Sequence, residues 1–154
     1  MNSKELKKQI LSNLKEQLSE KEFQWIESKN MHLGIFTEPC LTYMLDGIKT
    51  IESRFSKNRI LPYEQIETND IVLVKKSGGN ILAFFTIQEI LFFDLEKTPI
   101  SFIREKYEKE LCVDQEFWKQ KETSRYATLI RIEKIVKLKP FSISKRGMQT
   151  WIKL

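Results

Sequence analysis

The densest group of polar side chains that could do chemistry lies between Gly47 and Arg54. A β-branched run begins at Thr50 and predicts a strand, in which alternate side chains share a face. Thr50, Glu52 and Arg54 are therefore expected on one face. Lys49 lies at the mouth of this strand and can reach the same face. An ammonium, a hydroxyl, a carboxylate and a guanidinium within about 10 Å of one another are more polar chemistry than a plain edge strand needs, which indicates a functional site. The simpler interpretation is an exposed strand with a surface ion pair, worth about 0–1 kcal/mol.

The positive charge of the chain is concentrated in two segments. The formal net charge is +5. Residues 49–60 contain four basic side chains against Glu52 alone, and residues 134–154 contain six basic and no acidic side chains. If folding brings both segments to one surface, that surface suits a polyanion such as RNA. The alternative is that these charges only keep a strand-rich surface soluble.

Length and composition indicate one cytoplasmic domain with no membrane partner. The 154 residues are 41% hydrophobic, enough for a core, and no run of about 18 apolar residues could cross a membrane. The N-terminus has no apolar stretch typical of a signal peptide. Cys40 and Cys112 are isolated, which indicates buried thiols in a reducing compartment. His32 is the only histidine and is expected to be structural, so we expect no metal or cofactor site.

The first 29 residues predict a helical extension. Apolar residues recur at helical spacing over residues 3–18, and Ser19 with Glu22 forms a capping box that begins a second helix. An apolar stripe needs burial, so we expect both helices to pack on the rest of the chain. The alternative is an interface for a partner or a second copy.

The remaining elements predict an α+β domain over residues 30–154, built as a small, mostly antiparallel β-barrel with surrounding helices. Gly78 and Gly79 indicate a hairpin turn, and Pro140 is expected to end the strand that precedes it. The expected strands are residues 31–36, 50–54, 71–74, 81–92, 126–138 and 151–154; the expected helices are one from Pro39 to Asp46 and two within residues 98–121.

Three motifs in this order resemble the ASCH domain of the PUA-like superfamily. They are Gly47-x-Lys49-x-x-Glu52-x-Arg54, the run Asn69-Asp70-Ile71-Val72-Leu73-Val74, and the closing segment from Pro140 to Gly147. The resemblance implies a PUA-like barrel with RNA or a nucleotide held in a solvent-accessible cleft beside the first motif. Lys49, Glu52 and Arg54 would line that cleft, and their charges suit a nucleotide.

The same resemblance bears on catalysis. The acetylcytidine amidohydrolases of this family carry a nucleophilic threonine where this chain has Glu52, so that mechanism is disfavoured. Other ASCH proteins are metal-dependent ribonucleases, and Glu52 would then be a ligand for a divalent cation.

The sequence therefore predicts an RNA- or nucleotide-binding module whose ligand is single-stranded RNA or a nucleotide. The alternatives are a hydrolase acting on RNA or on a modified nucleoside amide, with Lys49 and Glu52 as catalytic residues, and an adaptor that binds a protein partner. The predicted binding residues are Lys49, Thr50, Glu52, Arg54, Lys57, Arg59, Tyr63, Arg125, Tyr126, Lys145 and Arg146.

Overall fold

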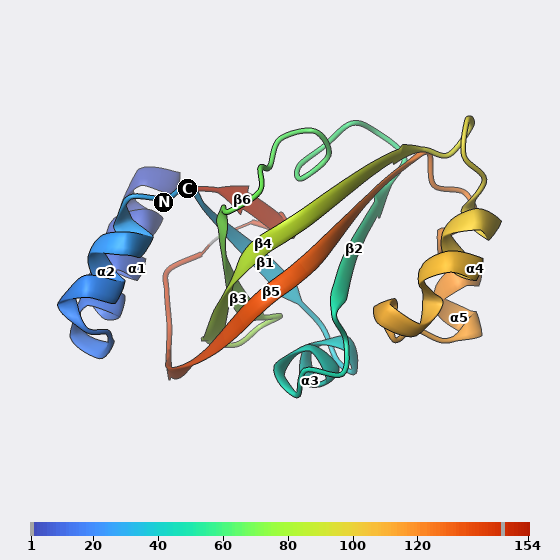
Figure 1. Cartoon of the computed structure of the whole chain (residues 1–154). Helices are drawn as coiled ribbons and strands as arrows, with labels where there is room; N and C mark the ends of the chain where they lie inside the picture. Colours follow the sequence, from blue (N-terminus) through green and yellow to red (C-terminus); the bar gives the residue numbers. More distant parts are fainter. Residues whose placement is uncertain (1, 146) are drawn as a thin grey trace. The chain divides into compact units, whose positions relative to one another are not determined.

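A computed structural model describes residues 2–145 and 147–154, and its elements form a mixed α+β fold (Figure 1). In chain order these are α1 (Ser3–Gln17), α2 (Glu20–Glu27), β1 (Met31–Phe36), α3 (Cys40–Leu45), β2 (Ile51–Ser56), β3 (Ile71–Lys76), β4 (Ile81–Asp94), α4 (Ile100–Leu111), α5 (Gln115–Lys121), β5 (Tyr126–Phe141) and β6 (Trp151–Lys153). The predicted fold class is confirmed.

The six strands form one sheet in the order β2-β5-β4-β3-β1-β6. The pair β1–β3 is parallel, whereas β1–β6, β2–β5 and β3–β4 are antiparallel, so the sheet is mostly antiparallel as predicted. The chain divides into two compact units. The first comprises Met1–Thr37, Asn69–Thr86 and Lys134–Leu154, and the second comprises Glu38–Thr68 and Ile87–Glu133.

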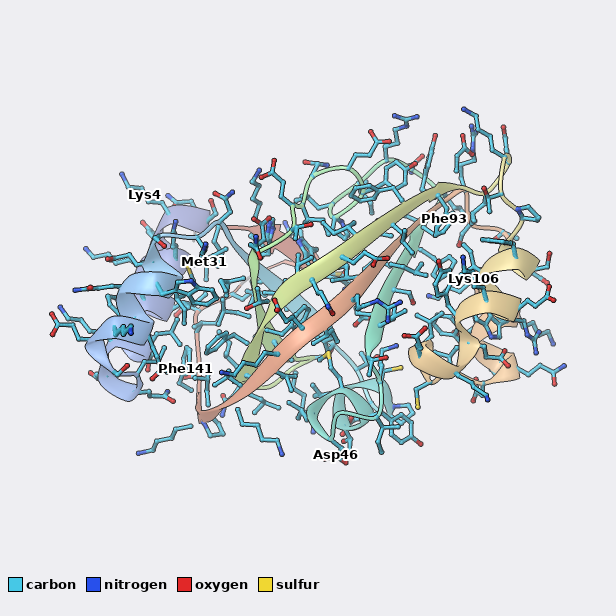
Figure 2. All side chains as sticks on the ribbon, viewed as in Figure 1. Lys4, Met31, Asp46, Phe93, Lys106 and Phe141 are labelled. Atoms are coloured by element: carbon cyan, nitrogen blue, oxygen red, sulfur yellow. The ribbon has the colours of Figure 1, made fainter. Side chains whose placement is uncertain are left out.

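The two N-terminal helices pack within the first unit. Ile10, Leu14 and Ile26 are fully buried and belong to one apolar cluster with residues of β1, β3 and β4. Lys4 projects from the outer side of α1 (Figure 2). The capping box is present, since the backbone N–H of Glu22 donates to Oγ of Ser19 over 3.2 Å. The predicted packing of these helices on their own chain is confirmed.

Two glycines of the first unit occupy positions where a side chain would not fit, one because of its backbone conformation and one because of neighbouring rings. Gly78 has φ +69° in the β3–β4 hairpin, a conformation that favours glycine, as the sequence predicted. Gly34 lies under aromatic rings: a Cβ there would stand 2.7 Å from Cε2 of Phe36 and 3.3 Å from Cζ3 of Trp151. Any larger residue at position 34 would therefore displace a ring.

Strand β5 continues through Pro140, which corrects the prediction that proline ends it. The backbone beside Pro140 bonds to a side chain. Gln17 donates its Nε2–H to the carbonyl of Lys139 over 2.9 Å, and its Oε1 accepts from the N–H of Lys139 over 2.8 Å. Gln17 thus pairs with the backbone of Lys139 as a neighbouring strand would, and proline is tolerated near the end of a strand where its missing N–H leaves no partner unpaired.

His32 is buried in a hydrogen-bonded cluster of the first unit. Its Nε2 lies 2.8 Å from Oδ2 of Asp70, and its Nδ1 accepts from the indole N–H of Trp151 over 3.2 Å. An indole nitrogen only donates, so Nδ1 must carry a lone pair and Nε2 the proton. The imidazole is therefore neutral and tethers β1 to β6, in agreement with the structural role expected for it.

Acid is expected to destabilise the protein through His32. Burial lowers the pKa of His32 below its usual value near 6.5, although the hydrogen bond to Asp70 opposes the shift. The unfolded chain takes up the proton first as pH falls, so this stability is complete above about pH 6.5 and is lost as pH drops through the folded pKa. The free energy of unfolding, measured with urea at pH 7.5 and 5.0, gives this loss of stability. His32→Gln removes the titration, and identical pH dependence in both proteins would contradict the prediction.

The second unit packs α4 and α5 against β2 and β5. Ile51 of β2 and Leu129 of β5 share an apolar cluster with residues of both helices. Helix α5 begins at the predicted cap, where Oδ1 of Asp114 accepts from the N–H of Phe117 over 2.9 Å. These contacts hold β2, which carries the first motif, beside the end of α4.

Candidate functional site

The β2–β5 ladder places the predicted site residues of the second unit on one face. Directly opposed pairs are Glu52 with Ile130, Arg54 with Thr128, and Ser56 with Tyr126. Opposed residues share a face, and so do alternate residues of each strand. The side chains of Glu52, Arg54 and Tyr126 therefore belong to the same face.

Lys49 and Glu52 are buried, which corrects the expectation of a solvent-accessible cleft around them. They are 2% and 7% exposed. Nζ of Lys49 donates to the carbonyl of Leu111 over 2.5 Å and lies 4.0 Å from Oε1 of Glu52. Leu111 ends α4, where carbonyls lack partners within the helix and the helix dipole favours a cation. The side chain of Lys49 therefore points to the C-terminal end of α4 and not to solvent.

Glu52 sits between two cations. Its Oε2 lies 3.6 Å from Nη2 of Arg54, and its Oε1 accepts from the N–H of Ser53 over 2.7 Å. Burial lowers the pKa of Arg54, while the charge of Glu52 opposes that shift. Since 17% of the Arg54 side chain is exposed, it is the charged member of the motif that a ligand can reach.

A second group of predicted residues forms what we call the tyrosine–arginine cluster: Arg59, Tyr63, Arg125 and Tyr126. The rings of Tyr63 and Tyr126 lie 4.7 Å apart. The guanidinium of Arg59 lies 5.8 Å from the first ring and 5.2 Å from the second, and that of Arg125 lies 5.2 Å from the second. Both tyrosines are buried, whereas 59% of the Arg59 side chain is exposed. The guanidinium of Arg59 therefore lies over two buried tyrosine rings, while most of the Arg59 side chain is exposed to solvent.

Exposed apolar side chains border this cluster. Ile60 is 57% exposed, and its carbonyl accepts from the N–H of Tyr63 over 2.9 Å. Phe92 is 36% exposed, and its ring lies 5.4 Å from the ring of Tyr63. The sequence reading did not single out either residue, because nothing local in the sequence sets them apart from core residues.

Three carboxylates partly neutralise the cluster. Nε of Arg125 bonds to Oδ1 of Asp94 over 2.9 Å, and its Nη1 lies 3.1 Å from Oε1 of Glu96. Arg59 lies 3.7 Å from Glu64. Two guanidinium groups thus face three carboxylates, so this surface is not strongly positive and does not suit a long run of phosphates.

The other predicted residues are not members of these two groups. Thr50 and Lys57 are exposed residues of the second unit. Lys145 belongs to the first unit, and its Nζ donates to the carbonyl of Gly147 over 2.9 Å. Arg146 lies outside the described residues. The two basic segments of the sequence therefore belong to different units.

Two general features complete the description. Among residues 2–145 and 147–154, no three His, Cys, Asp or Glu side chains gather closely enough to hold a metal ion. Within the same residues, no helix combines the length and apolar character needed to cross a membrane.

The element order and the sheet define an α+β fold that solved structures share. The ASCH protein of Zymomonas mobilis matches with a TM-score of 0.64 at 13% identity, over 80% of this chain and 87% of that one. Two variants of that protein match with the same TM-score and identity, over 89% and 87% of their chains. No family model and no curated protein matches this sequence. The chain therefore has the ASCH fold that its motifs predicted.

Proposed function

We propose that this chain is an RNA- or nucleotide-binding ASCH module whose ligand base lies against Tyr63 and Tyr126. The observation that carries this proposal is the guanidinium of Arg59 over both rings. Bases stack on tyrosine rings and on guanidinium planes alike. A base can therefore take the place of Arg59 on the rings or lie on the guanidinium itself.

Neighbouring groups on the same face supply the polar contacts that a nucleotide needs. Arg54 is two residues from Ser56, which is opposite Tyr126, so the Cα atoms of Arg54 and Ser56 are about 7 Å apart along the strand. Arg54 can donate hydrogen bonds to a base edge or to a phosphate. Lys57 and Arg59 are exposed and can neutralise one or two phosphates. The expected ligand is a single-stranded segment, because a base must be unstacked to lie on Tyr126.

Binding of a short fluorescent single-stranded RNA is expected to be micromolar or weaker. Fluorescence anisotropy across a salt series should give a fall in log K of about 0.7–1.4 per unit of log salt, as expected for one or two neutralised phosphates. Tyr126→Leu should weaken binding by about 1–3 kcal/mol, because it removes a stacking ring. The matched control is Tyr43→Leu, at a tyrosine that is 37% exposed on α3. No binding at low salt, or equal loss in both variants, would contradict the proposal.

Hydrolysis is a second candidate function, favoured by the buried amine of Lys49 beside Glu52. An amine and a carboxylate can exchange protons with a substrate that gains access to them. Turnover of RNA and of acetylcytidine should be measured with and without magnesium. Product formation that disappears in Lys49→Met would support this function. No product under conditions where RNA is bound would contradict it.

A further inference from the structure

Phe92 of β4 presents an aromatic ring to solvent in the second unit. It is 36% exposed, whereas its neighbours Leu91 and Phe93 are partly buried against the apolar cluster of α4 and α5. Successive side chains of a strand point to opposite faces, so Phe92 points away from those helices. Tyr126 of the adjacent strand β5 does the same, because the next residue, Ala127, belongs to that cluster. Phe92 and Tyr126 therefore lie on the same face of the sheet.

Tyr63 joins Phe92 to the tyrosine–arginine cluster. Its ring lies 5.4 Å from the ring of Phe92, at an interplanar angle of 66°, and 4.7 Å from the ring of Tyr126. The guanidinium of Arg59 lies 5.8 Å from the same Tyr63 ring, so with the 5.4 Å to Phe92 these two outer groups are no more than about 11 Å apart. One buried tyrosine thus adjoins two solvent-exposed planar groups, a guanidinium and a phenyl ring.

Neither core packing nor a protein interface accounts well for this exposed ring. The contact with Tyr63 is edge-to-face and leaves part of the Phe92 ring in solvent. The exposed apolar side chains at the cluster are Ile60 and Phe92, and the ion pairs of Arg59 and Arg125 border them. Stable protein interfaces take about 20–30 residues from each partner and are depleted of charge at their centre. A small apolar surface with planar and charged groups side by side is better suited to nucleotides.

We propose that Phe92 is the platform for a second base of the ligand, which makes the site specific for two or three consecutive unpaired nucleotides. This inference rests on the proposed function, in which the first base lies at Arg59 and the tyrosine rings. Stacked nucleotides are about 3.4 Å apart along one strand and unstacked ones are further apart, so two or three of them span the separation between Arg59 and Phe92. Sheets that bind single-stranded RNA use two or three aromatic side chains in this manner. The ligand class is then an oligonucleotide and not a mononucleotide.

The experiment uses single-stranded oligoadenylates of one to six nucleotides as unlabelled competitors of a short fluorescent RNA, at constant ionic strength. The affinity of the wild type should rise by at least about tenfold between one and three nucleotides, because the second base gains a ring on which to stack. Phe92→Leu keeps an apolar side chain but removes the ring. It should weaken binding of the trinucleotide by about tenfold and leave that of the mononucleotide unchanged. Additional phosphates strengthen binding in every variant, so comparison at equal length isolates the ring.

Two further variants serve as controls. Phe102 is 42% exposed on α4, and its ring contacts Phe93, whose side chain packs on the opposite side of the sheet from Phe92. Phe102→Leu therefore makes the same chemical change at an exposed phenylalanine elsewhere and should bind every oligonucleotide as the wild type does. Phe92→Tyr keeps a ring at the platform and should also retain the affinity for the trinucleotide.

Tyr126→Leu separates failure of this inference from failure of the proposed function. If the wild type binds no RNA, or if Tyr126→Leu binds as tightly as the wild type, the proposed function is wrong and the second platform is wrong with it. If Tyr126→Leu weakens binding but Phe92→Leu matches Phe102→Leu at every length, only the second platform is overturned. Equal weakening of the mononucleotide and the trinucleotide by Phe92→Leu would also overturn it, because the ring would then only support Tyr63. A wild-type oligomer that Phe92→Leu dissociates in sedimentation velocity would assign the ring to a protein contact instead.

Discussion

Replacing Glu52 by glutamine is expected to lower the free energy of unfolding by about 3–5 kcal/mol, because it removes one partner of a buried ion cluster. Lys49 is 2% exposed, with Nζ 4.0 Å from Oε1 of Glu52. Arg54 lies 3.6 Å from Oε2. Glutamine still offers an acceptor to the N–H of Ser53 but no charge, so two cations lose their counter-ion. Urea unfolding followed by circular dichroism measures the loss.

A matched control separates burial from charge. Glu108 forms an ion pair with Arg104 over 2.9 Å, but the two side chains are 43% and 45% exposed. Glu108→Gln should therefore cost less than about 0.5 kcal/mol. In the double variant Lys49→Met with Glu52→Gln, the buried amine is also gone, and the loss should be smaller than in Glu52→Gln alone. A cost for Glu52→Gln as small as the control's would show that the carboxylate is solvated in solution.

The elements that sequence reasoning predicted well have local signals. The capping box at Ser19, the cap at Asp114 and the turn at Gly78 depend on residues within a few positions of each other. Apolar spacing likewise predicted α1 and β1. For such elements, the residues that decide the structure are neighbours in the chain.

The residues next to the first motif in the sequence do not indicate what surrounds its side chains in the fold. The face occupied by Glu52 and Arg54 follows from strand alternation, but the direction of the Lys49 side chain does not. Its partner is the carbonyl of Leu111, 62 positions further along the chain. The four-carbon stem could reach water or a helix end, and only the placement of α4 decides between them.

The same limit applies to the tyrosine–arginine cluster. Tyr63 and Tyr126 were predicted as separate stacking residues on their aromatic character alone. The sequence does not show that their rings pair at 4.7 Å under Arg59. Nor does it show that Asp94, 31 positions earlier, holds Arg125. Charge counted along the chain therefore overestimated how basic this surface is.

Ile10→Ala is the other substitution with a large expected effect, a loss of about 2–5 kcal/mol in the free energy of unfolding. Ile10 of α1 is fully buried in the apolar cluster of the first unit, together with Leu33 and Leu73. Removing its outer carbons loses their burial and leaves a cavity that the surrounding strands cannot fill completely. Thermal and urea unfolding of the full chain measure the effect.

The same experiment tests whether the N-terminal helices serve the fold or a partner. Ile48 offers a control of the same residue type, since it is 58% exposed, and Ile48→Ala should change stability by less than about 0.5 kcal/mol. A helix that only docks on another protein would not stabilise its own chain. In that case Ile10→Ala and Ile48→Ala would have similar free energies of unfolding, and only Ile10→Ala would change self-association. Sedimentation velocity of wild type and Ile10→Ala measures that difference. Because Ile10 is enclosed by strands of its own unit, we expect a loss of stability and an unchanged sedimentation coefficient for the folded protein; the reverse would assign the apolar stripe to an interface.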